Sequence, residues 1–241
     1  MTEKVKVEEY VLVAEARRQV YDLLSVLYLE LPNLKMIQSI FSAEFKRELS
    51  SAVSNFEADE IKEGLTLIAS FVTAFKEQST EEVLKRISID RTRLLRGVSQ
   101  QHSPLPPYES VYRDGRLYSE STIEVSQIYA RLGIILPETW TEPPDYIGIE
   151  LDFMRLICQG EKDAWQTDSF DKALEHLEVG GDFLKKHILQ WIPRFCEEMY
   201  SKAELDFYKG IAHFTSGFVA YDSSLADQQI MAVKHKPAAG T

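Results

Sequence analysis

Apolar residues recur every three or four positions along most of the 241-residue chain, and this spacing limits the fold more than any other feature. Such spacing places apolar side chains on one face of an α-helix. No segment shows the sustained alternation that is typical of half-buried strands. The sequence therefore predicts an all-α fold, a single-domain helical bundle of about ten helices over residues 1–241. The clearest stripes are Ala16, Val20, Leu23 and Leu27; Ile61, Leu65, Ile68, Val72 and Phe75; Leu184, Ile188, Trp191 and Phe195; and Phe207, Ile211, Phe214, Phe218 and Tyr221.

Short local signals predict where several helices begin and end. One helix is expected over about 34–53. Ser79 and Glu82 form a predicted capping box, and Ser88 or Asp90 is expected to cap a helix that stops at Gly97. A helix end is expected at Gly180 and Gly181, and a kink at Pro193. Residues 97–121 and 133–144 lack helical spacing, so we expect connecting segments there. We expect flexible tails at residues 1–8 and 227–241.

The charge balance excludes some classes of partner. The formal net charge is −11, which argues against binding to nucleic acid or to anionic membrane surfaces and is compatible with a cationic partner. No apolar run approaches the length of a membrane span, so we expect no membrane insertion. Arg17 and Arg18 lie among acidic residues without a following apolar segment, so they are interpreted as the solvated face of the first helix rather than as a targeting signal. A cytoplasmic location is expected.

The residues that usually carry chemistry do not form a recognisable pattern. The sequence has no phosphate-binding glycine loop, no nucleophile elbow and no zinc-protease motif. The five histidines are scattered, and no two are spaced for one helical face. Cys158 and Cys196 are interpreted as buried, reduced packing residues rather than a disulfide. We therefore predict neither a catalytic residue, nor a metal site, nor a cofactor.

Residues 142–154 join a proline-stiffened acidic loop to an amphipathic helix that begins near Ile147. Asp145 stands where a helix N-cap is expected. Between Arg131 and Arg155 the chain contains five acidic residues and no Lys or Arg. The segment is therefore predicted to meet a positively charged partner. The alternative is a plain helix start that follows a solvated acidic loop.

A second distinctive segment, Pro106 to Tyr112, reads Pro-Pro-Tyr-Glu-Ser-Val-Tyr and is followed by an Asp-Gly turn signal. Together with Glu-Pro-Pro-Asp at 142–145, it resembles the TorD/DmsD/NarJ family, the cytoplasmic chaperones of molybdopterin oxidoreductases. The resemblance spans roughly residues 17–160. Two positions depart from the family pattern. Tyr146 replaces a histidine, and the block Arg91-x-x-Leu94-Leu95 lacks both of the family's aromatic residues.

The resemblance implies an all-helical chaperone that binds the N-terminal, twin-arginine-type leader of a molybdoenzyme subunit and holds the apo-enzyme for cofactor insertion. Its implied partners are the apo-molybdoenzyme catalytic subunit with that leader and the molybdenum-cofactor insertion machinery. The protein itself would be a monomer or a helix-swapped dimer. The residues expected at the leader-binding site are Arg93, Leu94, Leu95, Pro107, Tyr108, Glu109, Glu142, Pro143, Pro144, Asp145, Tyr146 and Glu150.

Two other functions remain open on the sequence. The first is an all-α enzyme or small-ligand-binding protein that uses the same proline-rich cleft. Converging titratable groups would favour that reading, whereas an apolar cleft with one acidic rim would favour peptide binding. The second is an interaction module for a redox complex without molybdenum.

Overall fold

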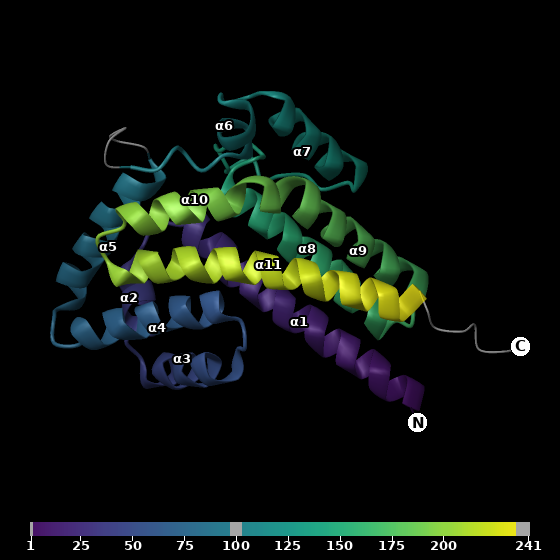
Figure 1. The fold of residues 1–241 in the computed structure, drawn as a ribbon, viewed down its shortest axis with the longest axis horizontal. Helices are drawn as coiled ribbons and strands as arrows, with labels where there is room; N and C mark the ends of the chain where they lie inside the picture. Colours follow the sequence, from purple (N-terminus) through teal and green to yellow (C-terminus); the bar gives the residue numbers. More distant parts are fainter. Residues whose placement is uncertain (1, 97–102, 235–241) are drawn as a thin grey trace, which may run out of the picture. The chain divides into compact units, whose positions relative to one another are not determined.

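The computed structural model describes residues 2–96 and 103–234, and it confirms the predicted all-α class. Within these residues the β-structure amounts to one isolated bridge. The helices, shown in Figure 1, are α1 (Thr2–Leu29), α2 (Leu34–Ile40), α3 (Ala43–Asn55), α4 (Asp59–Ala74), α5 (Thr80–Leu95), α6 (Glu109–Asp114), α7 (Glu120–Arg131), α8 (Ile147–Gln166), α9 (Phe170–Phe183), a π-helix η1 (Leu184–Ile188), α10 (Leu189–Lys202) and α11 (Asp206–Lys234).

The chain divides into two compact units built from separate stretches of sequence. Unit 1 contains residues 1–29, 147–190 and 219–241, and unit 2 contains residues 30–146 and 191–218. The chain passes between the units at the end of α1, at the start of α8, within α10 and within α11. The expectation of a single domain stays a prediction. So does the flexibility of the tails, although helix already covers residues 2–8 and 227–234.

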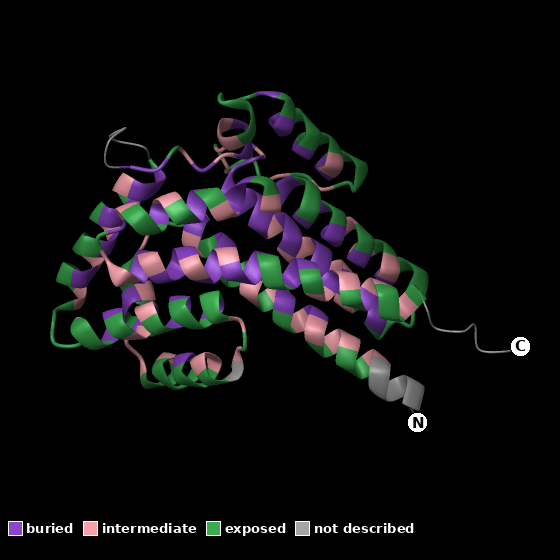
Figure 2. Ribbon diagram, viewed as in Figure 1, coloured by how far each residue is buried: buried purple, intermediate pink, exposed green. Residues whose placement is uncertain are grey.

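In unit 1, α8 packs against both α1 and α9. Buried residues, purple in Figure 2, occupy most of α8, which the apolar spacing from Ile147 onward predicted. The buried face of α1 differs from the predicted stripe. Tyr21 and Leu24 are buried, whereas Leu23 is exposed. The buried face of α1 is rotated relative to the predicted one because Arg17 lies on it. Apolar spacing alone would not place a charge there.

Arg17 corrects the interpretation of Arg17 and Arg18 as a solvated pair. Its side chain is only 3% exposed and forms ion pairs with Glu161 of α8 and with Asp222 of α11. Its Nε atom lies 2.5 Å from Asp222 Oδ1, and the hydroxyl of Tyr21 donates to Oδ2 of the same carboxylate at 2.7 Å. Trp165 Nε1 donates to Glu161 at 3.2 Å. Hydrogen bonds thus compensate the burial of these charges, as a stable interior requires.

In unit 2, the predicted stripe of α4 is buried at Ile61, Leu65, Ile68 and Val72. Two glycines allow α4 to approach α11 backbone to backbone. A Cβ atom added to Gly64 would lie 2.6 Å from the backbone nitrogen of Phe214, and one added to Gly210 would lie 2.6 Å from the carbonyl oxygen of Gly64. Neither position has room for any side chain.

Several predicted helix ends differ from the structure. Ser42 caps α3 and so divides the expected helix over 34–53 into α2 and α3. Ser79 caps α5 as predicted, with its hydroxyl accepting from the Glu82 N–H at 3.2 Å. However, α5 continues unbroken through Ser88 and Asp90, and α9 continues through Gly180 and Gly181. The end expected at Gly97 lies outside the described residues, although α5 already ends at Leu95.

Asp90 does have a capping role, but on a distant helix. Its carboxylate is buried and accepts the backbone N–H of Leu205 at 2.9 Å and that of Glu204 at 3.2 Å. These groups lie just before the N-terminus of α11, where backbone N–H groups lack intrahelical acceptors. Asp90 therefore fastens α5 to the start of α11 within unit 2.

Candidate functional site

The two segments that carry the family resemblance meet in unit 2. Tyr108 and Tyr146 form an isolated antiparallel bridge, and the backbone N–H of Glu109 donates to the carbonyl oxygen of Asp145 at 3.0 Å. The rings of Tyr108 and Tyr146 pack at a centroid distance of 5.4 Å with an interplanar angle of 52°. Residues separated by about 35 positions in sequence thus form one local structure.

The acidic loop before α8 has a defined turn conformation. The N–H of Tyr146 donates to the carbonyl oxygen of Pro143 at 3.0 Å, which closes a tight turn. The hydroxyl of Tyr129, on α7, donates to the carbonyl oxygen of Pro144 at 3.3 Å. Because proline also fixes φ, the loop has few alternative conformations. The expected stiffness of this loop therefore has a structural basis.

Asp145 is fully buried and caps a different helix from the predicted one. Its Oδ2 atom accepts the backbone N–H of Ser110, in the first turn of α6, at 2.9 Å. The expectation that it caps the helix beginning near Ile147 is therefore corrected. Its Oδ1 atom is also buried and has no hydrogen-bond partner in the described part of the chain. Asp145 holds the two segments together from within and presents no charge at the surface.

Glu142 presents the accessible negative charge of this site. Its side chain is 19% exposed, and Oε1 lies 2.7 Å from Nη1 of Arg96. The hydroxyl of Tyr108 donates to Oε2 of the same carboxylate. Arg96 follows the last residue of α5 and is 57% exposed. Glu142 thus lies between a half-buried phenol and a solvated guanidinium.

The two tyrosines stay neutral near pH 7. Burial raises the pKa of the Tyr108 phenol, and its hydrogen bond to Glu142 raises that pKa further. Burial raises the pKa of Tyr146 to about 12. Burial alone would lower the pKa of Arg96, but its hydrogen bond to Glu142 and the charge of that carboxylate make the net shift upward. Glu142 therefore faces one hydroxyl donor and one permanent cation.

The other expected site residues divide by exposure. Leu94, Leu95 and Pro107 are buried, so they belong to the support of the site rather than to its surface. Arg93 is partly exposed and pairs with Asp90 at 2.5 Å. Glu109 is buried and pairs with Arg113. Pro143 is buried and Pro144 is partly exposed, whereas Glu150 is buried in unit 1. Their roles in leader binding stay predictions.

Sequence reasoning did not identify Arg96. It lies directly after the block Arg91-x-x-Leu94-Leu95, and a basic residue at a helix C-terminus is ordinarily explained by the helix dipole. It could have been identified by comparing this block with the acidic loop. A loop that carries only negative charge needs a cation, and an arginine at the end of the block can supply it. Only the folded chain brings Arg96 to Glu142.

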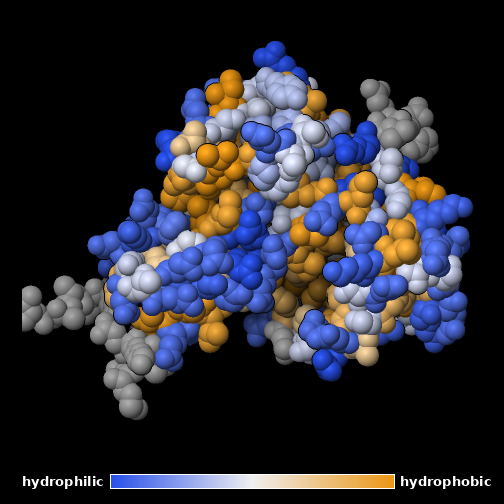
Figure 3. Space-filling view, turned by 180° about the vertical axis from the view of Figure 1, so that it is seen from behind, coloured by the Kyte–Doolittle hydropathy of each residue, from blue (hydrophilic) through white to orange (hydrophobic). Residues whose placement is uncertain are grey.

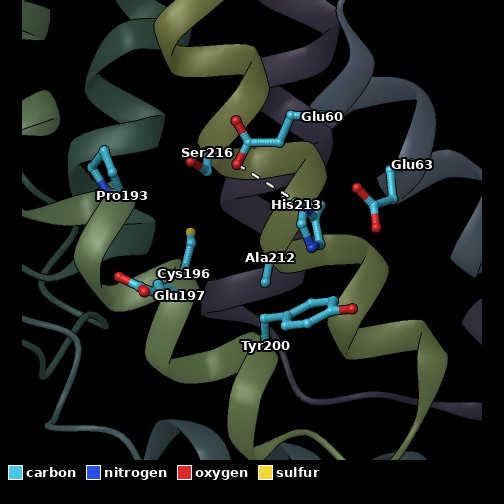
Figure 4. A pocket seen from close by; sticks show the side chains of 9 residues that line it. All are labelled: Glu60, Glu63, Pro193, Cys196, Glu197, Tyr200, Ala212, His213 and Ser216. Atoms are coloured by element: carbon cyan, nitrogen blue, oxygen red, sulfur yellow. Dashed lines mark ion pairs between the residues drawn. The ribbon is translucent and has the colours of Figure 1, made fainter.

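A separate hollow in unit 2 was also missed. Its volume is about 410 Å³, and Figure 4 shows side chains from α4, α10 and α11 around it. His213 Nδ1 lies 4.0 Å from Glu60 Oε1, and the Tyr200 ring packs edge-on against His213 at 4.3 Å. No group of three or more His, Cys, Asp or Glu residues suited to a metal ion occurs in the described residues. The lining is Glu60, Glu63, Pro193, Cys196, Glu197, Tyr200, Ala212, His213 and Ser216.

The surface carries both polar and apolar side chains, and the face drawn in Figure 3 has hydrophobic areas among hydrophilic ones. In unit 2 the exposed apolar residues around α7 include Ile123 and Ile135. No described helix combines the length and apolar character that crossing a membrane requires.

The chain is similar in sequence to known proteins over most of its length. The chain is 24% identical to Chaperone protein TorD of Vibrio cholerae serotype O1 (strain M66-2), over 92% of this chain and 97% of that protein. It is 26% identical to Chaperone protein TorD of Aliivibrio salmonicida (strain LFI1238), over 77% and 89% respectively. A candidate redox enzyme maturation protein from Archaeoglobus fulgidus aligns over 88% of this chain and 93% of its own, at 19% identity and a TM-score of 0.39. That structural alignment is too weak to carry an argument.

This all-α chain is similar over most of its length to proteins named Chaperone protein TorD, and it is of the TorD-like class. Residues 57–197, more than half of the chain, match the model of the nitrate reductase delta subunit family, and the protein belongs to that family. The resemblance predicted from the two motifs is thereby confirmed. The relatives are named as chaperones, in agreement with the prediction of a non-catalytic protein.

Proposed function

We propose that this protein is a cytoplasmic redox-enzyme maturation chaperone that binds the N-terminal leader of a molybdoenzyme subunit and holds the apo-enzyme for cofactor insertion. The observation that carries the proposal is the pairing of Tyr108 with Tyr146 beside the accessible carboxylate of Glu142. Family membership and the TorD relatives support the same class of function.

The chemistry of the site suits a basic peptide. A twin-arginine leader offers two guanidinium groups followed by an apolar segment that can form a helix. Glu142 can accept a guanidinium in charge-assisted hydrogen bonds, which are stronger than neutral ones. Because its side chain is mostly shielded, the interaction is screened less than that of a fully exposed pair. The Tyr108 hydroxyl orients the carboxylate for this contact.

The charge alone cannot supply the affinity. An exposed ion pair contributes under about 1 kcal/mol, and a hydrogen bond to a charged group contributes about 1.5–3 kcal/mol. Micromolar binding needs about 8 kcal/mol. Most of the affinity must therefore come from apolar contacts along the peptide, while Glu142 fixes its orientation. Tyr108 and Pro144 are the accessible members of the site that can begin such contacts.

The alternative function is that of an all-α small-ligand protein or enzyme. At the site described, titratable groups do not converge on an open cavity: Asp145 is buried and Glu142 is already paired with Arg96. This arrangement favours peptide recognition over catalysis. The client subunit, the cofactor-insertion machinery and the choice between monomer and helix-swapped dimer remain part of the proposal.

Calorimetry against synthetic leader peptides of molybdoenzymes encoded near this gene tests the proposal. We expect one such peptide to bind, and Glu142→Gln to weaken it about tenfold, which corresponds to about 1.4 kcal/mol. Glu82→Gln is the control, since it breaks another Arg–Glu pair, on α5, and should leave binding unchanged. The proposal fails if no leader binds, or if Glu142→Gln binds as tightly as the wild type.

A further inference from the structure

The carboxylate proposed to receive an arginine from the leader already holds an arginine of the protein itself. Arg96 Nη1 lies 2.7 Å from Glu142 Oε1, while the Tyr108 hydroxyl engages Oε2. Both oxygens of Glu142 therefore have a donor in the free protein. Each oxygen can accept a second hydrogen bond, but a leader guanidinium that approaches Glu142 from the Arg96 side must compete with Arg96 for the same carboxylate.

We propose that Arg96 is an internal occupant of the leader-arginine site, and that the arginine of an incoming leader displaces it from Glu142. This inference rests on the proposed function. It assigns Arg96 a competing role in which its guanidinium covers the charge of Glu142 until a peptide with the same chemical group takes its place.

Of the two donors, only Arg96 is free to leave. Its side chain is 57% exposed, and the hydrogen bond to Glu142 runs from a single guanidinium nitrogen, so it lacks the two-pronged geometry of the strongest Arg–carboxylate pairs. Its backbone stays anchored because the Arg96 N–H donates to Thr92 at the end of α5. Swinging this long side chain into solvent requires no change in the fold.

Tyr108, in contrast, is held on three sides. Its backbone forms the bridge to Tyr146, its ring packs against the Tyr146 ring, and its N–H donates to the carbonyl oxygen of Pro106 at 2.8 Å. Removing its hydroxyl from Glu142 would require separating the two segments of the site. The exchange therefore occurs on the Arg96 side of the carboxylate, with Tyr108 fixed as the orienting donor.

The exchange has two consequences for recognition. First, Glu142 is never left as a partly buried charge without a cation, which would carry a desolvation cost. Second, a guanidinium replaces a guanidinium, so an arginine matches the outgoing contact in shape and charge, whereas lysine offers only a point charge on a flexible stem. The leader arginine gains only the difference between its own contact with Glu142 and the outgoing Arg96 contact, so an arginine is favoured over a lysine.

The test measures binding of a synthetic leader peptide that contains an Arg-Arg pair. We expect Arg96→Gln to bind it about three- to tenfold more tightly than the wild type at low salt, because the competitor is absent. The gain should shrink at high salt, where charge attraction is screened. Arg96→Lys, a weaker occupant, should give an intermediate affinity. Replacing both leader arginines by glutamine, which carries no charge, should abolish the gain.

Two controls separate competition from damage to the fold. Arg86→Gln removes a similarly exposed arginine from its pair with Glu82, and it should leave leader binding unchanged. Glu142→Gln combined with Arg96→Gln should bind no better than Glu142→Gln alone, because there is no carboxylate left to uncover. A gain in the double variant equal to that of Arg96→Gln alone would mean that Arg96 acts elsewhere.

The two proposals fail in different ways. If the wild type binds the leader and Glu142→Gln weakens it, but Arg96→Gln binds equally or more weakly, the exchange is wrong and the proposed function stands. If neither the wild type nor Arg96→Gln binds any leader, both proposals are wrong.

Discussion

Two arginine–carboxylate clusters in this protein use the same chemical groups for different ends. In unit 1, Arg17 is 3% exposed and pairs with Glu161 and Asp222. In unit 2, Arg96 is 57% exposed and pairs with Glu142. The buried cluster joins α1, α8 and α11, whereas the open one joins a helix end to a loop. Exposure, rather than residue type, separates an ion pair that holds the fold from one available for exchange.

The free energies of the two kinds of ion pair explain why the Arg17 cluster and the Arg96 pair cannot serve each other's function. Removing one member of a buried pair leaves an uncompensated charge in a low-dielectric interior, at a cost of about 3–5 kcal/mol. An exposed pair contributes about 0–1 kcal/mol, because water solvates either partner when the pair opens. The Arg17 cluster is therefore unsuited to ligand exchange, and the Arg96 pair is unsuited to holding helices together.

The largest expected effect is on folding. Arg17→Met should lower the free energy of unfolding by about 3–5 kcal/mol, since Glu161 and Asp222 lose their shared cation. Denaturant unfolding followed by circular dichroism measures this change. Arg18→Gln on the next position, whose pair with Glu15 is partly exposed, should cost less than about 1 kcal/mol. Equal losses of unfolding free energy in the two variants would contradict the distinction between the buried and the exposed ion pair.

A second prediction concerns the buried acid of the open site. Asp145→Ala should lower the free energy of unfolding by about 1–2 kcal/mol, because the Ser110 N–H at the start of α6 loses its acceptor. Asp145→Asn keeps an acceptor oxygen and should cost clearly less. Thermal unfolding of both variants measures the difference.

Because Asp145 is buried, Asp145→Asn should also weaken leader binding less than Glu142→Gln does. The reverse order in calorimetry would mean that the charge of Asp145, rather than that of Glu142, meets the peptide.

A third, smaller effect is expected from the orienting phenol. Tyr108→Phe removes the hydroxyl that donates to Glu142 while keeping the ring that packs against Tyr146. We expect about a threefold loss of leader affinity and about 0.5–1.5 kcal/mol less stability. Tyr118→Phe alters a tyrosine that is 70% exposed and should change neither quantity. An unchanged leader affinity in Tyr108→Phe would show that the hydroxyl does not orient the carboxylate.

The smallest effect is a dependence on pH in unit 1. The hydrogen bond from Arg18 lowers the pKa of Glu15 to about 2, with Lys162 and Gln19 acting in the same direction and partial burial opposing them. A lowered carboxyl pKa contributes stability above its unfolded value, near 4.5, and loses it as pH falls toward 2. Glu15→Gln should therefore destabilise the protein slightly at pH 7 and progressively less below pH 4. A constant difference between pH 7 and pH 3 would contradict this assignment.

The sequence predicted the all-α class and the family because both depend on local patterns. The stripe from Ile61 to Val72 specifies one buried helical face, and the two proline-rich segments keep their identity wherever they fold. It also predicted that Tyr108 and Asp145 belong to one site. That prediction agrees with the bridge between their segments, although the leader-binding role of these residues is still a proposal.

The failures that concern charged residues share one physical cause, which is pairing with groups far away in the sequence. Arg17 is inward because two acids far along the chain meet it, so the hydrophobic pattern of α1 misplaced the buried face. Asp145 and Asp90 are acids near expected helix starts, yet each caps a helix elsewhere. Arg96 lacked any local signal of its partner Glu142. Local rules locate helices well but do not identify which distant polar group completes a buried or paired charge.

The contact between Gly64 and Gly210 has a consequence for how this protein can diverge. Most packing contacts tolerate change, because a larger residue on one helix can be offset by a smaller one opposite. Here each glycine already lies against the backbone of the opposite helix. Because glycine is the smallest residue, a larger residue at one position cannot be offset by a smaller one at the other. We therefore expect homologues that share this helix crossing to keep glycine at both positions together. Those that lose one should show α4 and α11 moved apart.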